Sequence, residues 1–182
     1  KRSVEYRGDY DESRINLASE YVRRGSYLAA KVQAEKALAI DPKNGFAISP
    51  LEGAKLALGD TLGWYKLWKQ GLWWTTPSYL DSLDHVFQEQ GFLGVIRDRI
   101  RVNEEVLASG GHISFSGQAG RHLILGEIDR AMDYYDLAGE HGDGSIAYIS
   151  LDHLSFPQLK TNPRYLALLK KLNLLDRFEM FE

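Results

Sequence analysis

The chain has 182 residues, 44% of them hydrophobic and 12% aromatic, which is enough to bury a sizeable core as one domain or one continuous array. Its 22 basic and 25 acidic residues give a formal net charge of -3 without a basic run that could neutralise a phosphate backbone, so direct nucleic acid binding is not expected. The lack of cysteine excludes disulfide scaffolds, thiolate zinc sites and thiol nucleophiles, but it leaves the compartment open between cytoplasm and bacterial periplasm.

The first residues show no targeting or membrane-spanning pattern. The opening KRSVEYRGDYDES lacks the apolar core of a signal peptide, and no apolar stretch of the chain approaches the roughly 20 residues that a transmembrane helix needs. Insertion of this chain into a membrane is therefore not expected. Because the chain does not begin with Met, we expect residues 1–10 to be a linker from an upstream region of a longer polypeptide.

Residues 11–44 are predicted to form two helices. The segment INLASEYVRRG has apolar residues at helical spacing and stops at Gly25. The segment YLAAKVQAEKALAI follows, and its small residues fall on one narrow face that a second helix could approach closely: Ala30, Ala34 and Ala37. Asp41-Pro42 is expected to end this helix, because the residue before a proline disfavours helical geometry.

Glycines between helical patterns then recur at a nearly constant spacing. Gly25, Gly59, Gly91 and Gly126 are separated by 34, 32 and 35 residues, and most flanking positions in equivalent slots are apolar. A period of this size indicates stacked helical hairpins. We therefore predict four hairpins, over residues 11–44, 45–76, 77–111 and 112–144.

The first of these hairpins resembles a tetratricopeptide repeat (TPR). The matching positions are Leu17, Ala18, Tyr21, Gly25, Ala30, Ala37 and Pro42. A second match in the last hairpin consists of Ala119, Gly126, Ala131, Tyr135 and Ala138, with Gln118 where leucine is usual. The resemblance implies an all-α fold in which stacked antiparallel hairpins form a superhelix.

The units between these two matches depart from the repeat pattern. Glu52, Lys55 and Gly71 occupy slots that are usually small or apolar, and Trp64 and Trp68 replace small packing residues. We expect both tryptophans to pack as core, one helical turn apart.

Prolines mark several helix boundaries. Thr76-Pro77 and Asn162-Pro163 each place a capping residue before a proline at the first helical position, so helices should begin there. Ser49-Pro50 leaves two alternatives, a helix that begins late or a helix that is interrupted.

Residues 145–182 break the repeat period and are predicted to cap the last hairpin with a C-terminal helix. Their pattern FPQL…NPRYLALLKKLNL resembles the end of the helical-repeat regions of bacterial signalling proteins. In those proteins a class III adenylate/guanylate cyclase or a winged-helix transcription regulator precedes a TolB-like segment and the repeats. The resemblance implies a role in signal transduction.

Motifs for catalysis or metal binding are not found. The five histidines have no metal-ligand spacing, and HGDG at 141–144 favours a turn over a cation site. The segment GGHISFSGQAGR lacks both a phosphate-loop lysine and a GxSxG nucleophile elbow, so we interpret it as a loop after which Ser114 or Ser116 caps the next helix. No catalytic residue, metal site or cofactor is expected.

Two groups of residues are candidates for partner contact. The first-helix surface of the best repeat would present Ile15, Ser19, Val22 and Arg23, on the side away from Leu17 and Tyr21; the resemblance implies peptide contact there. Trp73 and Trp74 are adjacent and cannot share one helix face, so one of them could anchor a partner, although packing of both is the alternative.

Three functions remain in competition. The repeats favour a non-catalytic protein-protein interaction module of a larger bacterial signal-transduction protein, with a protein or peptide partner. The tryptophans would suit a small-ligand sensor with a Trp-lined pocket. An enzyme built on helical hairpins is the third alternative, and self-association into a homo-oligomer is left open.

Overall fold

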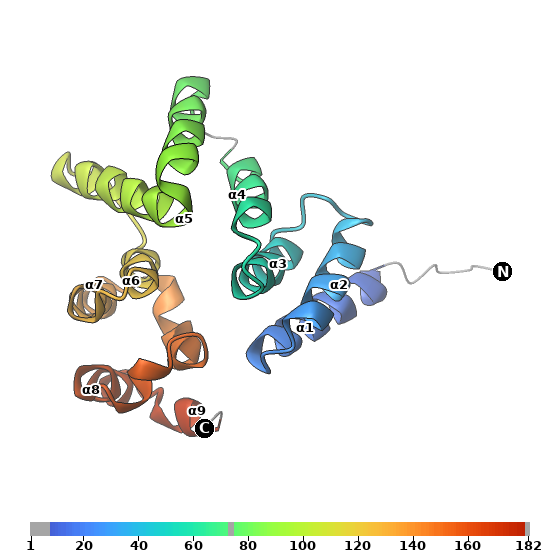
Figure 1. Ribbon diagram of the computed structural model, residues 1–182. Coiled ribbons are helices and arrows are strands. Elements are labelled where there is room, and N and C mark those ends of the chain that lie inside the picture. The colour runs from blue at the N-terminus through green and yellow to red at the C-terminus, as the bar shows by residue number, and fades with distance from the viewer. Residues whose placement is uncertain (1–7, 73–74, 181–182) are drawn as a thin grey trace. The chain divides into compact units, whose positions relative to one another are not determined.

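The computed structural model describes residues 8–72 and 75–180, and over these ranges the backbone forms helices and turns without a strand. The prediction of an all-α fold is confirmed. The helices are α1 (Gly8–Arg23), α2 (Tyr27–Leu38), α3 (Gly45–Ala57), α4 (Thr61–Gln70), α5 (Pro77–Ala108), α6 (Phe115–Ile124), α7 (Ile128–Glu140), η1 (Gly144–Leu154), η2 (Pro157–Thr161), α8 (Pro163–Lys171) and α9 (Leu175–Glu179), where η marks a 3₁₀-helix (Figure 1).

The chain divides into two compact units, residues 1–85 and residues 86–182. In unit 1, α1 packs on α2 and α3, α2 packs on α3, and α3 packs on α4. Small side chains make these approaches possible, because Ala18 and Ala34 pack with Leu51, while Ala37 and Ala47 pack with Ile15.

The alanine positions of the predicted packing faces are buried. Ala30, Ala34 and Ala37 on α2 and Ala131 and Ala138 on α7 are all shielded from solvent, as the repeat register requires. α2 ends before Asp41-Pro42, as expected. Buried alanines allow helices to approach closely at little cost in side-chain entropy.

The four glycines that define the repeat period have left-handed backbone conformations. The φ angles are 71° at Gly25, 76° at Gly59, 64° at Gly91 and 77° at Gly126. Gly25, Gly59 and Gly126 each lie between two helices, whereas Gly91 interrupts the helical geometry inside α5, with ψ at −160°. Residues with a Cβ rarely adopt these conformations, which explains the choice of glycine.

The predicted helix starts at prolines are present. α5 begins at Pro77 and the Thr76 hydroxyl accepts a hydrogen bond from the Tyr79 amide at 3.3 Å, while α8 begins at Pro163 and the Asn162 side chain accepts from the Tyr165 amide at 3.0 Å. At Ser49-Pro50 neither alternative holds, because α3 begins at Gly45 and continues through Pro50.

Unit 2 has its main core between the α6–α7 pair and the C-terminal segment. α6 packs on α7, and buried side chains of both helices join those of η1, η2, α8 and α9 in one cluster that includes Leu123, Tyr135, Leu159, Leu169 and Phe178. The C-terminal segment thus covers the last helix pair. It does so with two 3₁₀-helices and two α-helices, rather than with one capping helix.

Gln118, which stands where the resemblance to a TPR predicts leucine, is fully buried in unit 2. Its side-chain oxygen accepts a hydrogen bond from the Asn103 amide at 2.8 Å, and its own amide donates to the Ile100 carbonyl at 3.3 Å. The substitution is tolerated because α5 supplies partners for both ends of the side chain.

Candidate functional site

The predicted partner surface on α1 is only partly exposed. Ile15 is 9% exposed and packs with Ala37 and Ala47, so its expected exposure is wrong. The reason is that α3 lies against α1 on the side that carries Ile15 and Ala18. Leu17, expected in the packing face, is instead 40% exposed.

The other predicted α1 positions lie at the edge of this contact. Ser19 and Val22 are half-buried, and a Cβ built on Gly53 of α3 would lie 3.7 Å from Val22 Cγ1. Arg23 is exposed, and its guanidinium forms an ion pair with Glu20 at 2.5 Å. The surface is open at Ser19 and Arg23, while Val22 also supports the contact between α1 and α3.

The predicted tryptophan anchor cannot be placed, since Trp73 and Trp74 lie outside the described residues. Trp64 and Trp68 on α4 stack with ring centroids 5.3 Å apart and an interplanar angle of 12°. Trp64 is buried and Trp68 is half-buried. The expectation that both are core residues is confirmed for Trp64 and only in part for Trp68.

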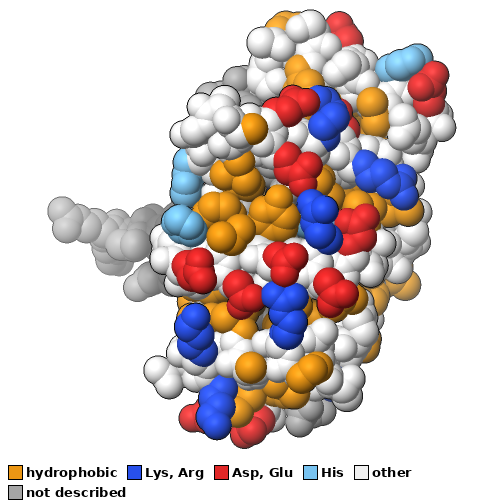
Figure 2. All heavy atoms as spheres, turned by 90° about the vertical axis from the view of Figure 1, so that its left-hand side faces the viewer, with side chains coloured by type: hydrophobic (Ala, Val, Ile, Leu, Met, Phe, Trp, Pro, Cys, Tyr) orange, Lys and Arg blue, Asp and Glu red, His pale blue; other side chains and the backbone are white. Residues whose placement is uncertain are grey.

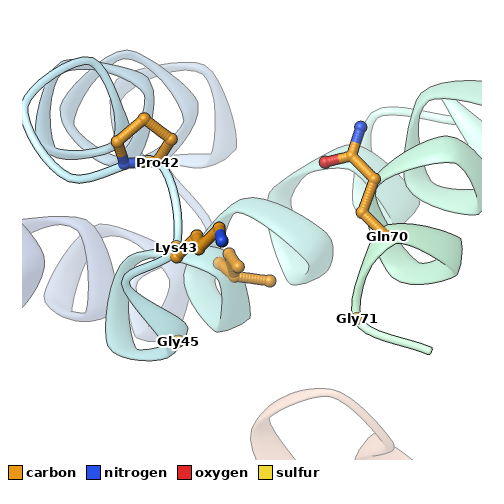
Figure 3. Close-up of a pocket in the computed structure, with 6 residues that line it drawn as sticks. Pro42, Lys43, Gly45, Gln70 and Gly71 are labelled. Carbon is orange, nitrogen blue, oxygen red and sulfur yellow. The ribbon is translucent and has the colours of Figure 1, made fainter. Parts of the chain in front are cut away.

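A pocket of about 700 Å³ lies in unit 1, between the α2–α3 turn, the start of α3 and the end of α4. It is lined by Pro42, Lys43, Gly45, Ile48, Gln70 and Gly71. In Figure 3, Lys43 is drawn between Pro42 of the α2–α3 turn and Gln70 at the end of α4. We call this pocket, together with the exposed residues Ile40 and Phe46 that flank the α2–α3 turn in sequence, the corner site.

Local hydrogen bonds explain how the turn of the corner site is held. The Asp41 carboxylate accepts a hydrogen bond from the Lys43 amide at 3.2 Å, and the Asn44 side chain accepts one from the Phe46 amide at 3.0 Å. Asn44 is thereby the N-cap of α3. These caps fix the backbone from which Lys43 and Phe46 extend.

The corner site combines apolar surface with unengaged polar groups. Phe46 is 81% exposed, and Ile40 is 54% exposed. Within the part of the chain that the structure describes, neither the Lys43 ammonium nor the Gln70 amide forms an ion pair or a hydrogen bond. Such a surface can hold an apolar side chain while binding a carboxylate or a backbone carbonyl.

The sequence interpretation did not identify the corner site. The segment DPKNGF predicts the end of one helix before the next hairpin, but a stop signal carries no information about which other helix ends beside it. The available signal was Phe46 itself, a large aromatic residue directly after Asn44-Gly45, where the first turn of a helix tends to be exposed.

Titratable groups elsewhere have packing partners rather than a shared site. His122 Nδ1 lies 2.6 Å from Glu127 Oε2 and its ring stacks on Tyr134, while His153 Nδ1 lies 2.9 Å from the Ser150 carbonyl oxygen. Burial raises the pKa of Glu52, on α3, to about 7. A search of the described residues finds no group of three metal-ligating side chains.

The HGDG segment forms a turn in which Asp143 caps η1, and Ser114 caps α6 by accepting a hydrogen bond from the Gly117 amide. Both expectations are confirmed. Asp143 also accepts hydrogen bonds from the Ser116 amide and the Ser114 hydroxyl, each at 3.0 Å. Its oxygens are thus used to join the α6 loop to η1.

Charge on the visible face of unit 2 is mixed. Figure 2 shows acidic and basic side chains interspersed among hydrophobic ones on the left-hand side of Figure 1, where α7 and α8 lie. Among the ion pairs of unit 2, Arg164 of α8 pairs with Asp133 at 2.9 Å and with Asp136 at 2.8 Å. None of the described helices is both long enough and apolar enough to cross a membrane.

Comparison with known proteins gives no relative from which a function could be inferred: no family model, curated protein or solved structure matches this chain.

Proposed function

We propose that this chain is a non-catalytic protein-protein interaction module made of TPR-like helical hairpins, and that its corner site binds a peptide segment of the partner. The observation that carries the proposal is the pocket of the corner site, where Pro42 and Ile48 lie with the Lys43 ammonium and the Gln70 amide, neither of which pairs with a described residue. Phe46, which follows the lining residue Gly45, is 81% exposed. Leaving a phenylalanine side chain in water forgoes roughly 1.5–3 kcal/mol of burial free energy, which a partner could recover by covering it.

The chemistry of the corner site indicates the kind of segment that it would hold. An aliphatic or aromatic side chain would pack against Pro42 and Ile48, and an acidic side chain or a carbonyl would accept hydrogen bonds from Lys43 and Gln70. Neither Trp64 nor Trp68 belongs to the described lining of the pocket, so these two tryptophans do not support a small ligand at the corner site.

The wider setting that we propose is the TPR region of a larger bacterial signal-transduction protein. The support is the resemblance of the segment FPQL…NPRYLALLKKLNL to the ends of such regions, together with the cap that this segment builds on α6 and α7. Output chemistry such as cyclase activity would then belong to another part of the polypeptide.

The test begins with selection of peptides from a random display library on the immobilised chain. The affinity of selected peptides is then measured by fluorescence anisotropy for Lys43→Glu and Phe46→Ala. We expect each substitution to weaken binding about tenfold or more, since truncated anchors and reversed charges typically cost that much. Circular dichroism checks that helicity is unchanged.

Matched controls use exposed residues of the same kind in unit 1. Lys36→Glu changes another exposed lysine, and Leu28→Ala removes a side chain that is 70% exposed on α2. Both should leave affinity unaltered. Equal binding by all four variants would overturn the corner site as the contact surface.

A further variant separates the corner site from the α1 surface. Val22→Glu combined with Arg23→Glu alters α1 and leaves the pocket lining intact. If this double substitution abolishes binding while Lys43→Glu does not, the partner binds to the α1 surface instead. Turnover of a nucleotide or glycan by the purified chain, abolished by one polar substitution, would contradict the non-catalytic role.

A further inference from the structure

A second pocket, of about 440 Å³, lies in the C-terminal segment of unit 2 between η2, α8 and α9. It is lined by Lys160, Leu166, Ala167, Lys170, Leu175, Phe178 and Glu179, and we call it the cap pocket. All of these residues belong to unit 2, so the cap pocket is separate from the corner site of unit 1.

The cap pocket follows from the two-sided character of α8. Tyr165, Leu168 and Leu169 are buried in the core against α6 and α7, whereas Ala167 and Lys170 line the pocket; Leu166 lines the pocket as well and is partly buried against the core. Side chains three and four residues apart share a helix face, which explains why Leu166 and Lys170 come together.

The turn after α8 completes the pocket. Asn173 has a φ of 56°, and the Leu174 amide donates a hydrogen bond to the Leu169 carbonyl at 2.8 Å, so the chain reverses and α9 returns beside α8. Phe178 is then buried, with its ring 4.4 Å from that of His153. The side of the pocket formed by Leu166, Leu175 and Phe178 is therefore apolar and held by the core.

Positively charged side chains outnumber negatively charged ones in the described lining of the cap pocket. Among the described residues, Lys160 and Lys170 line it with one carboxylate, Glu179, and neither lysine forms an ion pair or hydrogen bond there. By contrast, two arginines of the same unit form ion pairs: Arg130 pairs with Glu104, and Arg164 pairs with Asp133 and Asp136. The two lysines of the pocket are thus available to a ligand.

We propose that the cap pocket is a second binding site, for a peptide segment of a partner protein in which an apolar side chain stands next to a carboxylate. The apolar side chain would pack on Leu166, Leu175 and Phe178, and the carboxylate would accept hydrogen bonds from the Lys160 and Lys170 ammonium groups. Glu179 repels a carboxylate at its own position and therefore favours one orientation of the segment.

This proposal is independent of the corner site. The positive charges of Lys160 and Lys170 favour an acidic segment. The apolar side of the pocket favours a segment with a large aliphatic or aromatic residue. A nucleic acid strand would make little use of the apolar side of the pocket, and the described lining contains no arginine for bidentate phosphate contacts.

The experiment is an NMR titration of the full chain, labelled with ¹⁵N, with the blocked tetrapeptide acetyl-DLFD-amide. We expect the amide signals of Lys160, Leu166, Lys170 and their neighbours to shift in a saturable way. Two comparison peptides isolate the components of the interaction, because acetyl-NLFN-amide lacks the carboxylates and acetyl-DSSD-amide lacks the apolar side chains. Both should bind about tenfold more weakly or worse.

Variants then test the lysines. Lys160→Gln combined with Lys170→Glu should weaken binding of the acidic peptide by about tenfold or more. The control is Lys171→Glu, which changes the adjacent exposed lysine outside the pocket and should leave affinity unaltered. The ¹⁵N spectrum of each variant confirms that the fold is retained.

Three results would overturn the proposal. These are equal binding of the acidic and amide peptides, equal loss with Lys171→Glu and with the double variant, or stronger shifts of the same signals by a single-stranded oligonucleotide. Shifts confined to residues 40–48 would assign the peptide to the corner site instead, so failure of this site is distinguishable from failure of the other.

Discussion

The hydroxyl of Tyr135 on α7 donates a hydrogen bond to the carboxylate of Asp152 on η1, and this pair joins the last helix pair to the C-terminal segment. Burial of Asp152 raises its pKa to about 6, and the bond from Tyr135 partly opposes that rise. Burial also raises the pKa of Tyr135. A carboxyl in this position makes the stability of unit 2 depend on pH.

Asp152→Asn should remove part of that dependence. A folded-state pKa above the unfolded value of 3.8 contributes stability that is present below pH 3.8 and is lost as the pH rises through about 6. The rise corresponds to roughly 3 kcal/mol. Urea unfolding of the natural chain between pH 4 and 7 should show this loss, and the variant should show a flatter profile.

Tyr135→Phe provides the complementary measurement. Without the phenol the opposing hydrogen bond is gone, so the pKa of Asp152 should rise further and the loss of stability should move to higher pH. A stability profile for Asp152→Asn that matches the natural chain would contradict the assignment.

Alanine substitutions at two glycines of unit 2 distinguish the cost of backbone strain from the cost of steric crowding. A Cβ on Gly126 or on Gly120 would meet no atom within 4 Å, but Gly126 has a φ of 77° and Gly120 lies within helix α6. Gly126→Ala should therefore lower the free energy of unfolding by about 1 kcal/mol, and Gly120→Ala should raise it by up to about 1 kcal/mol. Thermal unfolding of both variants is the measurement, and effects of equal sign would contradict the argument.

Ala30 tests the tight contact of α2 in unit 1. It is fully buried, so Ala30→Leu should overpack the interface and lower the free energy of unfolding by roughly 1–3 kcal/mol. Ala57→Leu, at the exposed end of α3, is the matched control and should change stability little. An unchanged melting temperature for Ala30→Leu would show that the interface can relax.

The sequence predicted the features that depend on local backbone chemistry. Gly25, Gly59 and Gly126 lie between helices, and Thr76 and Asn162 cap helices, because glycine freedom and side-chain capping act within a few residues. The period of the glycines predicted where helices turn, and at Gly91 the two helical stretches of α5 meet at a kink without an intervening loop.

The features that the sequence did not predict depend on contacts between distant elements. The burial of Ile15 and exposure of Leu17 were assigned the wrong way round, since the covered side of α1 depends on where α3 packs. The corner site requires α4 to end beside the α2–α3 turn, and the cap pocket requires α9 to return along α8. Helical periodicity in one segment carries no information about these contacts between helices that are distant in sequence.

The carboxylate of Asp143 offers a last test, because four donors converge on it from two segments. Oδ2 accepts from the Ser116 amide and the Ser114 hydroxyl, each at 3.0 Å, while Oδ1 accepts from the Ser145 amide at 3.0 Å and the Ser145 hydroxyl at 2.7 Å. Burial alone would raise the pKa of Asp143, but these hydrogen bonds outweigh it and hold the pKa well below its usual range. The side-chain NH2 group of an asparagine at position 143 would face one of these N–H or O–H donors, and no hydrogen bond could form there.

Asp143→Asn should therefore lower the free energy of unfolding at pH 7 by about 1–2 kcal/mol. A depressed folded-state pKa contributes stability that is present above the unfolded value of 3.8 and is lost as the pH falls, so the natural chain should lose this contribution in acid and the variant should not. Urea unfolding at pH 7 and pH 3 measures both quantities.

Asp136→Asn, an exposed acid paired with Arg164, is the control and should cost at most about 1 kcal/mol at pH 7. An Asp143→Asn variant as stable as this control at both pH values would show that the four hydrogen bonds do not hold the α6 loop to η1.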